Sequence, residues 1–165
     1  DEGVIRALYR ASQSGVKIEL IVRGICALKP GIKGVSENIR VISIIGKYLE
    51  HARVFYFKHA SPQLYFSSAD WMTRNLARRI ELLTAVENEE LAKHLMQLLQ
   101  LQCSDNVLAH ELQSDGSYIK VKGDTDKSIN NQDLIENYVA KVQKAVKKEN
   151  PSQIQLLTNR LFKDS

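Results

Sequence analysis

The strongest constraint on the fold is the succession of a helix-forming run, a glycine turn and a β-forming run in the first 22 residues. Residues 4–11 carry apolar side chains at helical spacing, and Ser14-Gly15 is a typical helix stop. Residues 17–22 are rich in β-forming side chains, and residues 39–45 repeat that pattern after a loop rich in glycine and proline. A helix that turns at a glycine into a buried strand is typical of α/β proteins. The sequence therefore predicts an α/β fold in which a mixed β-sheet is flanked by helices.

The remaining pattern predicts further strands and helices within a single domain that spans residues 1–165. The expected elements are a short helical turn over 46–50, a hairpin of strands 54–57 and 64–67, a loop or short helix over 68–75, a strand over 79–83, a helix over 89–102, a second hairpin that ends in 118–121, and a helix capped by 130–133 that stops at Pro151. Residues 110–165 carry the weakest patterns, and we expect them to form a helical and hairpin extension of the same domain.

Positive charge is concentrated in the first half of the chain. Residues 1–80 hold 13 Lys and Arg against 6 Asp and Glu, whereas residues 81–165 hold 10 against 13. This bias favours a localised anion site, although basic residues scattered over a solvated surface would give the same counts. Within the basic half, Lys29 and Lys33 flank glycines that let a backbone approach an anion, so this loop is a minor candidate for binding a phosphate chain.

The cysteine count and the hydropathy pattern favour a cytoplasmic protein. Cys26 and Cys103 have no metal-like spacing, and we expect them to be reduced, partly buried thiols. No apolar run approaches the roughly 20 residues of a membrane span, so association of a longer protein with a membrane surface is the alternative. The chain opens at Asp1 without an initiator Met or a signal peptide, which indicates a piece of a longer chain.

His51 differs from the other three histidines in the side chains that the predicted fold brings near it. Arg53 follows two residues later, at the start of the first hairpin. The return strand of that hairpin ends at Ser67-Ser68, with Asp70 directly behind. The sequence therefore predicts that these five side chains converge at strand ends in the basic half of the chain.

This set of side chains suits a phosphate. Imidazole can transfer a proton, guanidinium can grip two oxygens with parallel hydrogen bonds, and hydroxyls and turn amides can donate the remaining bonds. The transition state of phosphoryl transfer spreads negative charge over peripheral oxygens, which such donors stabilise. No Walker-type glycine-rich loop is present in the sequence, so a nucleotide would bind without that cradle.

The same residues carry a resemblance to a known superfamily. His51-Ala52-Arg53 followed by Ser67-Ser68-Ala69-Asp70 resembles the half-motif of the phospholipase D superfamily, His-x-Lys followed by Gly-Ser-x-Asn, with Arg, Ser and Asp as the replacements. With these replacements, and with the stretches 22–39, 48–54 and 67–81, the chain resembles the C-terminal domain of bacterial-type polyphosphate kinases. The resemblance runs from about residue 3 to about residue 107.

This resemblance implies a phospholipase D-like fold and a half-site for reversible transfer of the terminal phosphate of ATP to polyphosphate. The phosphorylated histidine of the family lies in a preceding catalytic domain, so the isolated chain is expected to be inactive. By position, Arg23 matches a family arginine that contacts the ATP phosphates, and His51 matches a second active-site histidine. Arg53, Ser67, Ser68 and Asp70 are implied near the phosphates, with Asp70 as either a functional or a structural residue.

The resemblance also implies ATP, ADP and polyphosphate as ligands, Mg²⁺ as the counter-cation, and assembly of the longer protein into a homo-oligomer. We find no metal-ligand cluster in the sequence, so Mg²⁺ is expected to arrive with substrate or to be held by the preceding domain. Two alternatives stay open from the residues alone. One is a half-domain of a phosphodiesterase or nuclease, and the other is a non-catalytic module that binds nucleic acid through the basic half.

Overall fold

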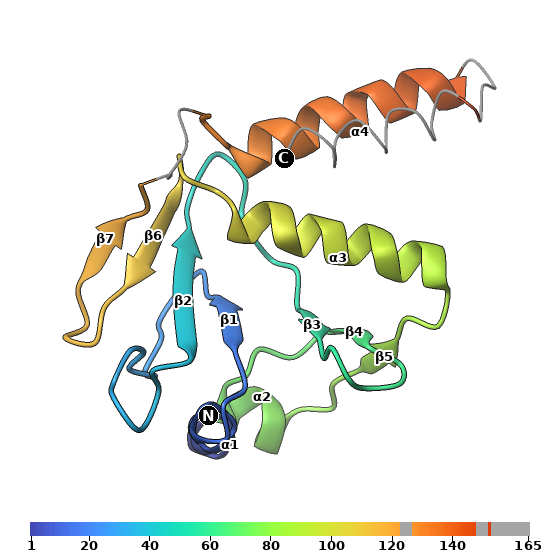
Figure 1. Ribbon diagram of the computed structural model, residues 1–165. Helices are drawn as coiled ribbons and strands as arrows, with labels where there is room; N and C mark the ends of the chain where they lie inside the picture. The colour runs from blue at the N-terminus through green and yellow to red at the C-terminus, as the bar shows by residue number, and fades with distance from the viewer. Residues whose placement is uncertain (123–126, 148–151, 153–165) are drawn as a thin grey trace.

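The computed structural model describes residues 1–122 and 127–147, together with Ser152 (Figure 1). These residues form four helices and seven strands. In chain order they are α1 (Glu2–Gln13), β1 (Ile18–Ile21), β2 (Ile39–Ile44), β3 (Val54–Tyr56), β4 (Leu64–Ser67), α2 (Thr73–Arg78), β5 (Leu83–Ala85), α3 (Glu89–Cys103), β6 (Ala109–Leu112), β7 (Tyr118–Lys120) and α4 (Asn131–Lys147).

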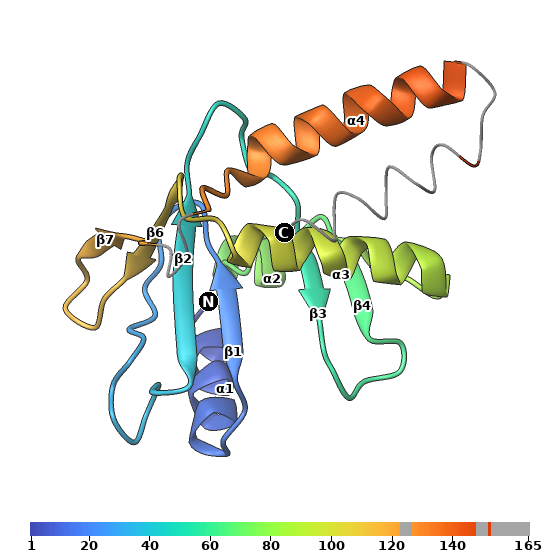
Figure 2. The same cartoon turned by 45° about the horizontal axis from the view of Figure 1, so that its top comes forward.

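The strands are divided between two sheets. The larger sheet has the order β1-β2-β6-β7, with β1 parallel to β2 and the other pairs antiparallel. The smaller sheet has the order β3-β4-β5 and is wholly antiparallel. Helix α3 runs from the smaller sheet to the larger one (Figures 1 and 2). The predicted α/β fold with a mixed sheet flanked by helices is confirmed, and the first hairpin forms a sheet of its own with β5.

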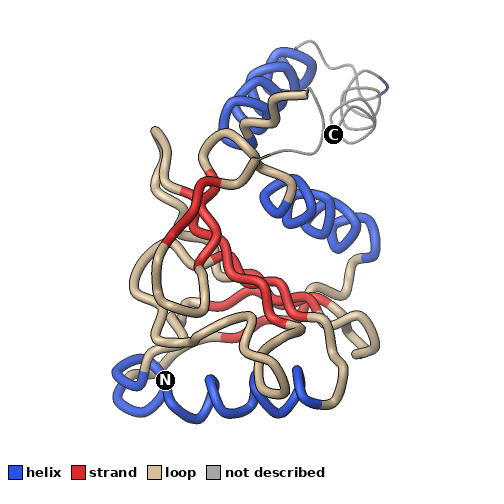
Figure 3. The backbone as a smooth tube through the Cα atoms, turned by 60° about the vertical axis from the view of Figure 1, so that its left-hand side comes forward, coloured by secondary structure: helices blue, strands red, loops and turns tan. Residues whose placement is uncertain are grey.

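The core is built on β2, which contributes buried apolar side chains to both faces of the larger sheet. Ile39 and Val41 lie in a cluster with apolar side chains of α1, while Ile42 and Ile44 lie in a second cluster with Ala109. Successive side chains of a strand point to opposite faces, so the two clusters lie on the two sides of the sheet. Figure 3 shows α1 and α2 on one side of the strands and α3 and α4 on the other.

Most of the predicted elements are present near their expected bounds. Helices α1 and α3, strands β1 to β4 and the β6–β7 hairpin are confirmed, and α2 supplies the short helix expected within 68–75. Helix α4 begins as predicted, because Asn130 Oδ1 accepts the N–H of Asp133 at 3.2 Å. The predicted stop at Pro151 lies outside the described residues.

The predicted helical turn over residues 46–50 is wrong. Residues 46–48 form an open bend instead. The N–H of Tyr48 donates to Gln132 Oε1 at 3.1 Å, and its carbonyl accepts from Gln132 Nε2 at 2.9 Å. The side chain of a distant glutamine therefore takes the hydrogen bonds that a helical turn would have satisfied locally.

The predicted strand over residues 79–83 begins later, at Leu83. The segment before it is held by loop contacts, because Ser68 Oγ accepts the N–H of Leu82 at 3.0 Å. Glu81 accepts hydrogen bonds from Ser68 and Asn75 in this segment. Side-chain bonds across the connection thus replace the first residues of the strand ladder.

Both cysteines are free and partly buried, as predicted. Burial raises the pKa of the Cys103 thiol to about 11, so it is uncharged near neutral pH. Among the described residues, no helix has both the length and the apolar character needed to cross a bilayer.

Candidate functional site

Two loops at the carboxyl ends of the parallel strands β1 and β2 carry Arg23 and His51. The carbonyl of Arg23 accepts a hydrogen bond from Ser43 Oγ at 3.3 Å, which ties the end of β1 to β2. His51 directly follows the segment 45–50, which arches over the strand ends next to the start of α4 (Figure 1). Parallel strands end at the same edge of a sheet, so residues 28 positions apart become neighbours.

The two side chains meet in an exposed position. Arg23 Nη1 lies 3.4 Å from His51 Nδ1 and donates to the carbonyl of Glu50 at 2.6 Å. A guanidinium can only donate, so Nδ1 is the acceptor in this contact and the neutral ring carries its proton on Nε2. Within the described part of the chain, His51 Nε2 and the Nε and Nη2 of Arg23 have no hydrogen-bond partner. A hydrogen-bond donor and a cation therefore stand side by side with groups available for an anion.

Arg53 and Asp70 are brought to the same region, where they bind each other. Arg53 donates from Nε and Nη2 to Asp70 Oδ1 at 3.0 and 2.8 Å, and its Nη1 donates to the carbonyl of His51 at 3.0 Å. The Arg53 side chain is 19% exposed, against 65% for Arg74, which lies 3.9 Å from the same carboxylate. All three nitrogens of Arg53 are thus engaged within the chain. Nε and Nη2 bind Asp70, and Nη1 holds the backbone of His51 in place.

Ser67 and Ser68 shape the turn after β4. Ser67 Oγ donates to the carbonyl of Leu82 at 2.8 Å and accepts the N–H of Ala69 at 3.0 Å. Ser68 Oγ donates to the carboxylate of Glu81, which also accepts from Asn75 Nδ2 at 2.8 Å. Both hydroxyls are therefore committed to the turn that carries Asp70. The ring of Trp71 stacks on Phe55, with ring centroids 4.8 Å apart, and anchors the same turn.

The Glu81 network predicts an acid-dependent loss of stability. The hydrogen bonds from Ser68 and Asn75 hold the pKa of Glu81 below its usual value. A depressed folded-state pKa adds stability above the unfolded-state pKa, and that stability is lost as the pH falls through the folded value. Glu81→Gln is therefore expected to lower the thermal midpoint at pH 7, and the deficit should close at acid pH. Thermal melts from pH 7 to 3 check this, with the exposed Glu37→Gln as control; a deficit independent of pH would contradict it.

The loop that contains Lys29 and Lys33 offers few free backbone donors to an anion. The N–H groups of Gly31 and Ile32 donate to Ser36, and that of Lys29 donates to the Tyr9 hydroxyl. The carbonyl of Gly34 accepts from Gln13 at the end of α1, which places this part of the loop at the amino ends of β1 and β2. Lys33 is therefore at the opposite end of the sheet from the Arg23–His51 pair.

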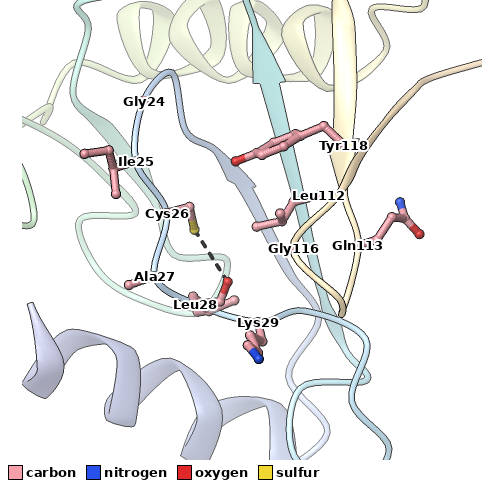
Figure 4. A pocket seen from close by; sticks show the side chains of 10 residues that line it. All are labelled: Gly24, Ile25, Cys26, Ala27, Leu28, Lys29, Leu112, Gln113, Gly116 and Tyr118. Carbon is pink, nitrogen blue, oxygen red and sulfur yellow. Dashed lines mark hydrogen bonds between the residues drawn. The ribbon is translucent and has the colours of Figure 1, made fainter.

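A shallow hollow lies beside Arg23 (Figure 4). It is lined by residues 24–29 and by the β6–β7 hairpin, with the Tyr118 ring and Leu112 on the hairpin side. Cys26 Sγ contacts the carbonyl of Leu28 at 3.8 Å within it. Among the described residues, Lys29 is the one cationic side chain in this lining, so the hollow adds little positive charge to the site.

The described residues do not form a metal centre. Within residues 1–122 and 127–147, no group of three or more His, Cys, Asp or Glu side chains is placed to hold an ion. Near His51, the carboxylate of Asp70 is bound to Arg53, and that of Glu50 accepts from Gln102 and Gln132 at 3.1 and 2.7 Å. These carboxylates are occupied by donors of the chain itself and do not fit a Mg²⁺ site.

Comparison with known proteins decides the family. Residues 1–132 match the family model described as "Polyphosphate kinase C-terminal domain 2". The chain belongs to the polyphosphate kinase family. This match confirms the resemblance to polyphosphate kinases that the sequence shows over about residues 3–107. The matched region also includes the β6–β7 hairpin and reaches the first turn of α4.

Curated polyphosphate kinases and a solved polyphosphate kinase structure agree with this assignment. The chain is 54% identical over 166 residues to a polyphosphate kinase of Campylobacter jejuni subsp. doylei, covering 100% of this chain and 24% of that protein. It is 55% identical over 141 residues to one of Helicobacter pylori, covering 86% of this chain and 20% of that protein. The crystal structure of polyphosphate kinase from Porphyromonas gingivalis matches 85% of this chain and 22% of that protein, with a TM-score of 0.80 and 40% identity.

The structural match confirms the phospholipase D-like fold class for this polyphosphate kinase domain. The chain spans about a quarter of the length of the curated relatives it matches. Two residues that support the site, Glu50 and Gln132, were not predicted as site residues. Glu50 could have been suspected as the neighbour of His51, but Gln132 had no signal beyond its place in a predicted helix cap.

Proposed function

We propose that this domain supplies one half of the active site for reversible transfer of the terminal phosphate of ATP to polyphosphate. The observation that carries the proposal is the exposed Arg23–His51 pair at the ends of β1 and β2. The nitrogens of this pair that have no hydrogen-bond partner among the described residues suit the charged, oxygen-rich transition state of phosphoryl transfer. The other half, including the histidine that is phosphorylated, would come from a preceding domain of a longer chain.

In this proposal Arg23 and His51 have different roles. Arg23 Nε and Nη2 form a planar fork that can bind two oxygens of the leaving or transferred phosphate. In the neutral ring, His51 Nε2–H can donate a hydrogen bond to an oxygen that develops negative charge. Donation of a proton requires the protonated ring, in which Nδ1 no longer accepts from Arg23. His51 is therefore a proton donor or phosphate ligand that faces the phosphorylated histidine.

Arg53, Ser67, Ser68 and Asp70 take supporting roles in this proposal. Arg53 and Asp70 are bound to each other, and the two hydroxyls are bound within the turn after β4. We therefore assign the Arg53–Asp70 pair to the alignment of His51, with direct phosphate contact left to Arg23 and His51. Mg²⁺ would enter with ATP or be held by the preceding domain, since the carboxylates near His51 are already bound.

Family membership favours a kinase over a phosphodiesterase or nuclease half-domain and over a nucleic-acid module. The longer protein would act in the cytoplasm on ATP, ADP and polyphosphate as a homo-oligomer. The domain would extend over residues 1–165, and the chain alone is expected to incorporate no phosphate from ATP.

The experiment compares His51→Ala with His59→Ala in a full-length polyphosphate kinase that carries this domain. His59 lies in the exposed loop between β3 and β4, so its replacement is the same chemical change outside the site. The proposal expects His51→Ala to lower kcat at least a hundredfold, the low end of general acid–base contributions of about 10² to 10⁴. Equal activity of the two variants would overturn it.

A further inference from the structure

We propose that Gln132 is a positioning residue that holds Glu50, and through Glu50 the Arg23–His51 pair, in the geometry that phosphate transfer requires. This inference rests on the proposed function of that pair. It assigns a role to the first turn of α4, which is distant in sequence from the residues of the motif.

Gln132 uses both ends of its amide to bind the segment before His51. Its Oε1 accepts the N–H of Tyr48 at 3.1 Å, while its Nε2 donates to the carbonyl of Tyr48 at 2.9 Å and to Glu50 Oε1 at 2.7 Å. The Gln132 side chain is buried, at 4% exposure. A buried side chain with three hydrogen bonds to one short segment fixes that segment more firmly than an exposed contact would.

Glu50 transmits this restraint to the site. Its carbonyl accepts the 2.6 Å hydrogen bond from Arg23 Nη1, and His51 is the next residue. Its carboxylate accepts from Gln102 on α3 as well as from Gln132 on α4. Glu50 is thus bound by two helices through its side chain and by Arg23 through its backbone.

The backbone that carries Gln132 is itself held in place. The preceding residue, Asn131, donates from its backbone N–H and from Nδ2 to Asp105 Oδ2 at 2.8 and 2.6 Å, and both residues are fully buried. On the opposite side, Gly46 lies so close that an added Cβ would collide with Gln132 Oε1 and lie 2.7 Å from Leu108 Cδ1. The arch over residues 46–50 therefore packs directly on Gln132.

Loss of this restraint would act mainly on the chemical step. Arg23 and His51 would remain present, but their alignment with the transferred phosphate would change. A displacement of about 1 Å can cost roughly a hundredfold in rate. The loss should therefore appear in kcat more than in KM for ATP.

The first test replaces Gln132 by methionine in the full-length kinase, with Gln143→Met as the matched control. Gln143 lies on α4 and, like Gln132, lines a groove between α4 and residues 48–50, without a described hydrogen bond to those residues. We expect Gln132→Met to lower kcat at least tenfold, with KM for ATP changed less than threefold and with both proteins folded at the assay temperature by thermal melt. A kcat within twofold of that of the control overturns the inference.

A second test exchanges the carboxylate of Glu50 and the amide of Gln132. Recovery of kcat in the double variant would tie the effect to the contact between these two side chains. Gln132→Glu keeps the acceptor for the Tyr48 N–H, but it turns a carboxylate oxygen toward both the Tyr48 carbonyl and Glu50, so kcat should fall. Adding Glu50→Gln supplies an amide donor opposite the new carboxylate, and kcat should recover at least threefold. A double variant no more active than Gln132→Glu would contradict the inference.

The outcomes also separate the inference from the function on which it rests. Full activity of Arg23→Ala and His51→Ala would remove the proposed function, whatever Gln132→Met does. Inactive site variants beside a fully active Gln132→Met would leave the proposed function intact and remove only the positioning role.

Discussion

Arg53→Leu is expected to lower the free energy of unfolding by about 2 kcal/mol and to lower the activity of the full-length kinase at least tenfold. The stability loss follows because hydrogen bonds to charged groups contribute about 1.5–3 kcal/mol and leucine leaves Asp70 without its paired donors. The activity loss follows because Arg53 Nη1 also holds the carbonyl of His51 at 3.0 Å. Without it, the imidazole loses the support that aligns it.

Denaturant unfolding of the chain and steady-state kinetics of the full-length enzyme check this prediction. Arg74→Leu is the control, because Arg74 lies 3.9 Å from the same carboxylate and its side chain is 65% exposed. Exposed ion pairs contribute about 0–1 kcal/mol, so this variant should be close to the wild type in both measurements. Similar losses for the two arginines would show that Arg53 has no special role in the site.

Asp105→Ala is expected to have the largest effect on stability, about 3–5 kcal/mol. Asp105 is fully buried, and its Oδ1 accepts the N–H groups of Val107, Leu108 and Ala109 at 3.0, 2.6 and 3.0 Å. Its Oδ2 accepts both donors of Asn131, which joins the start of α4 to the turn before β6. Alanine would leave five donors without this acceptor, three of them buried. Each unsatisfied buried group costs about 1–3 kcal/mol, with less than additive sums.

Chemical denaturation checks the prediction, with two further variants for comparison. Asp105→Asn keeps an acceptor for the turn but sets an amide donor against those of Asn131, so an intermediate loss is expected. Asp115→Ala removes an exposed carboxylate that accepts from Ser117 in the β6–β7 turn, and its loss of stability should be much smaller than that of Asp105→Ala. An Asp105→Ala protein as stable as Asp115→Ala would contradict the account of this turn.

The local part of the fold and site could be predicted because it depends on neighbours in sequence. The helix stop at Ser14-Gly15, the β patterns around β1 and β2, and the hairpin of β3 and β4 are set within windows of a few residues. Parallel strands then place Arg23 and His51 at one edge. Family motifs added the roles of these two residues, which spacing alone does not define.

The supports of the site could not be predicted because they depend on contacts between distant segments. Gln132 and Tyr48 are 84 positions apart, and nothing in either local pattern marks the pairing. The same contact turned an expected helical turn into a bend. Arg53 and Asp70 were both expected near phosphate, and only the three-dimensional arrangement shows that their charges neutralise each other.

The most direct test of the central claim is calorimetric binding of medium-length polyphosphate to this chain, beside Arg23→Ala, His51→Ala and the control Lys33→Ala. Charge-assisted hydrogen bonds contribute about 1.5 kcal/mol or more, so each site variant should weaken binding by more than about 1 kcal/mol, or roughly fivefold. Lys33→Ala, at the opposite end of the sheet, should change binding by less than half of that. Binding that responds equally to all three substitutions, or to none, would mean diffuse charge attraction and would contradict a phosphate half-site at Arg23 and His51.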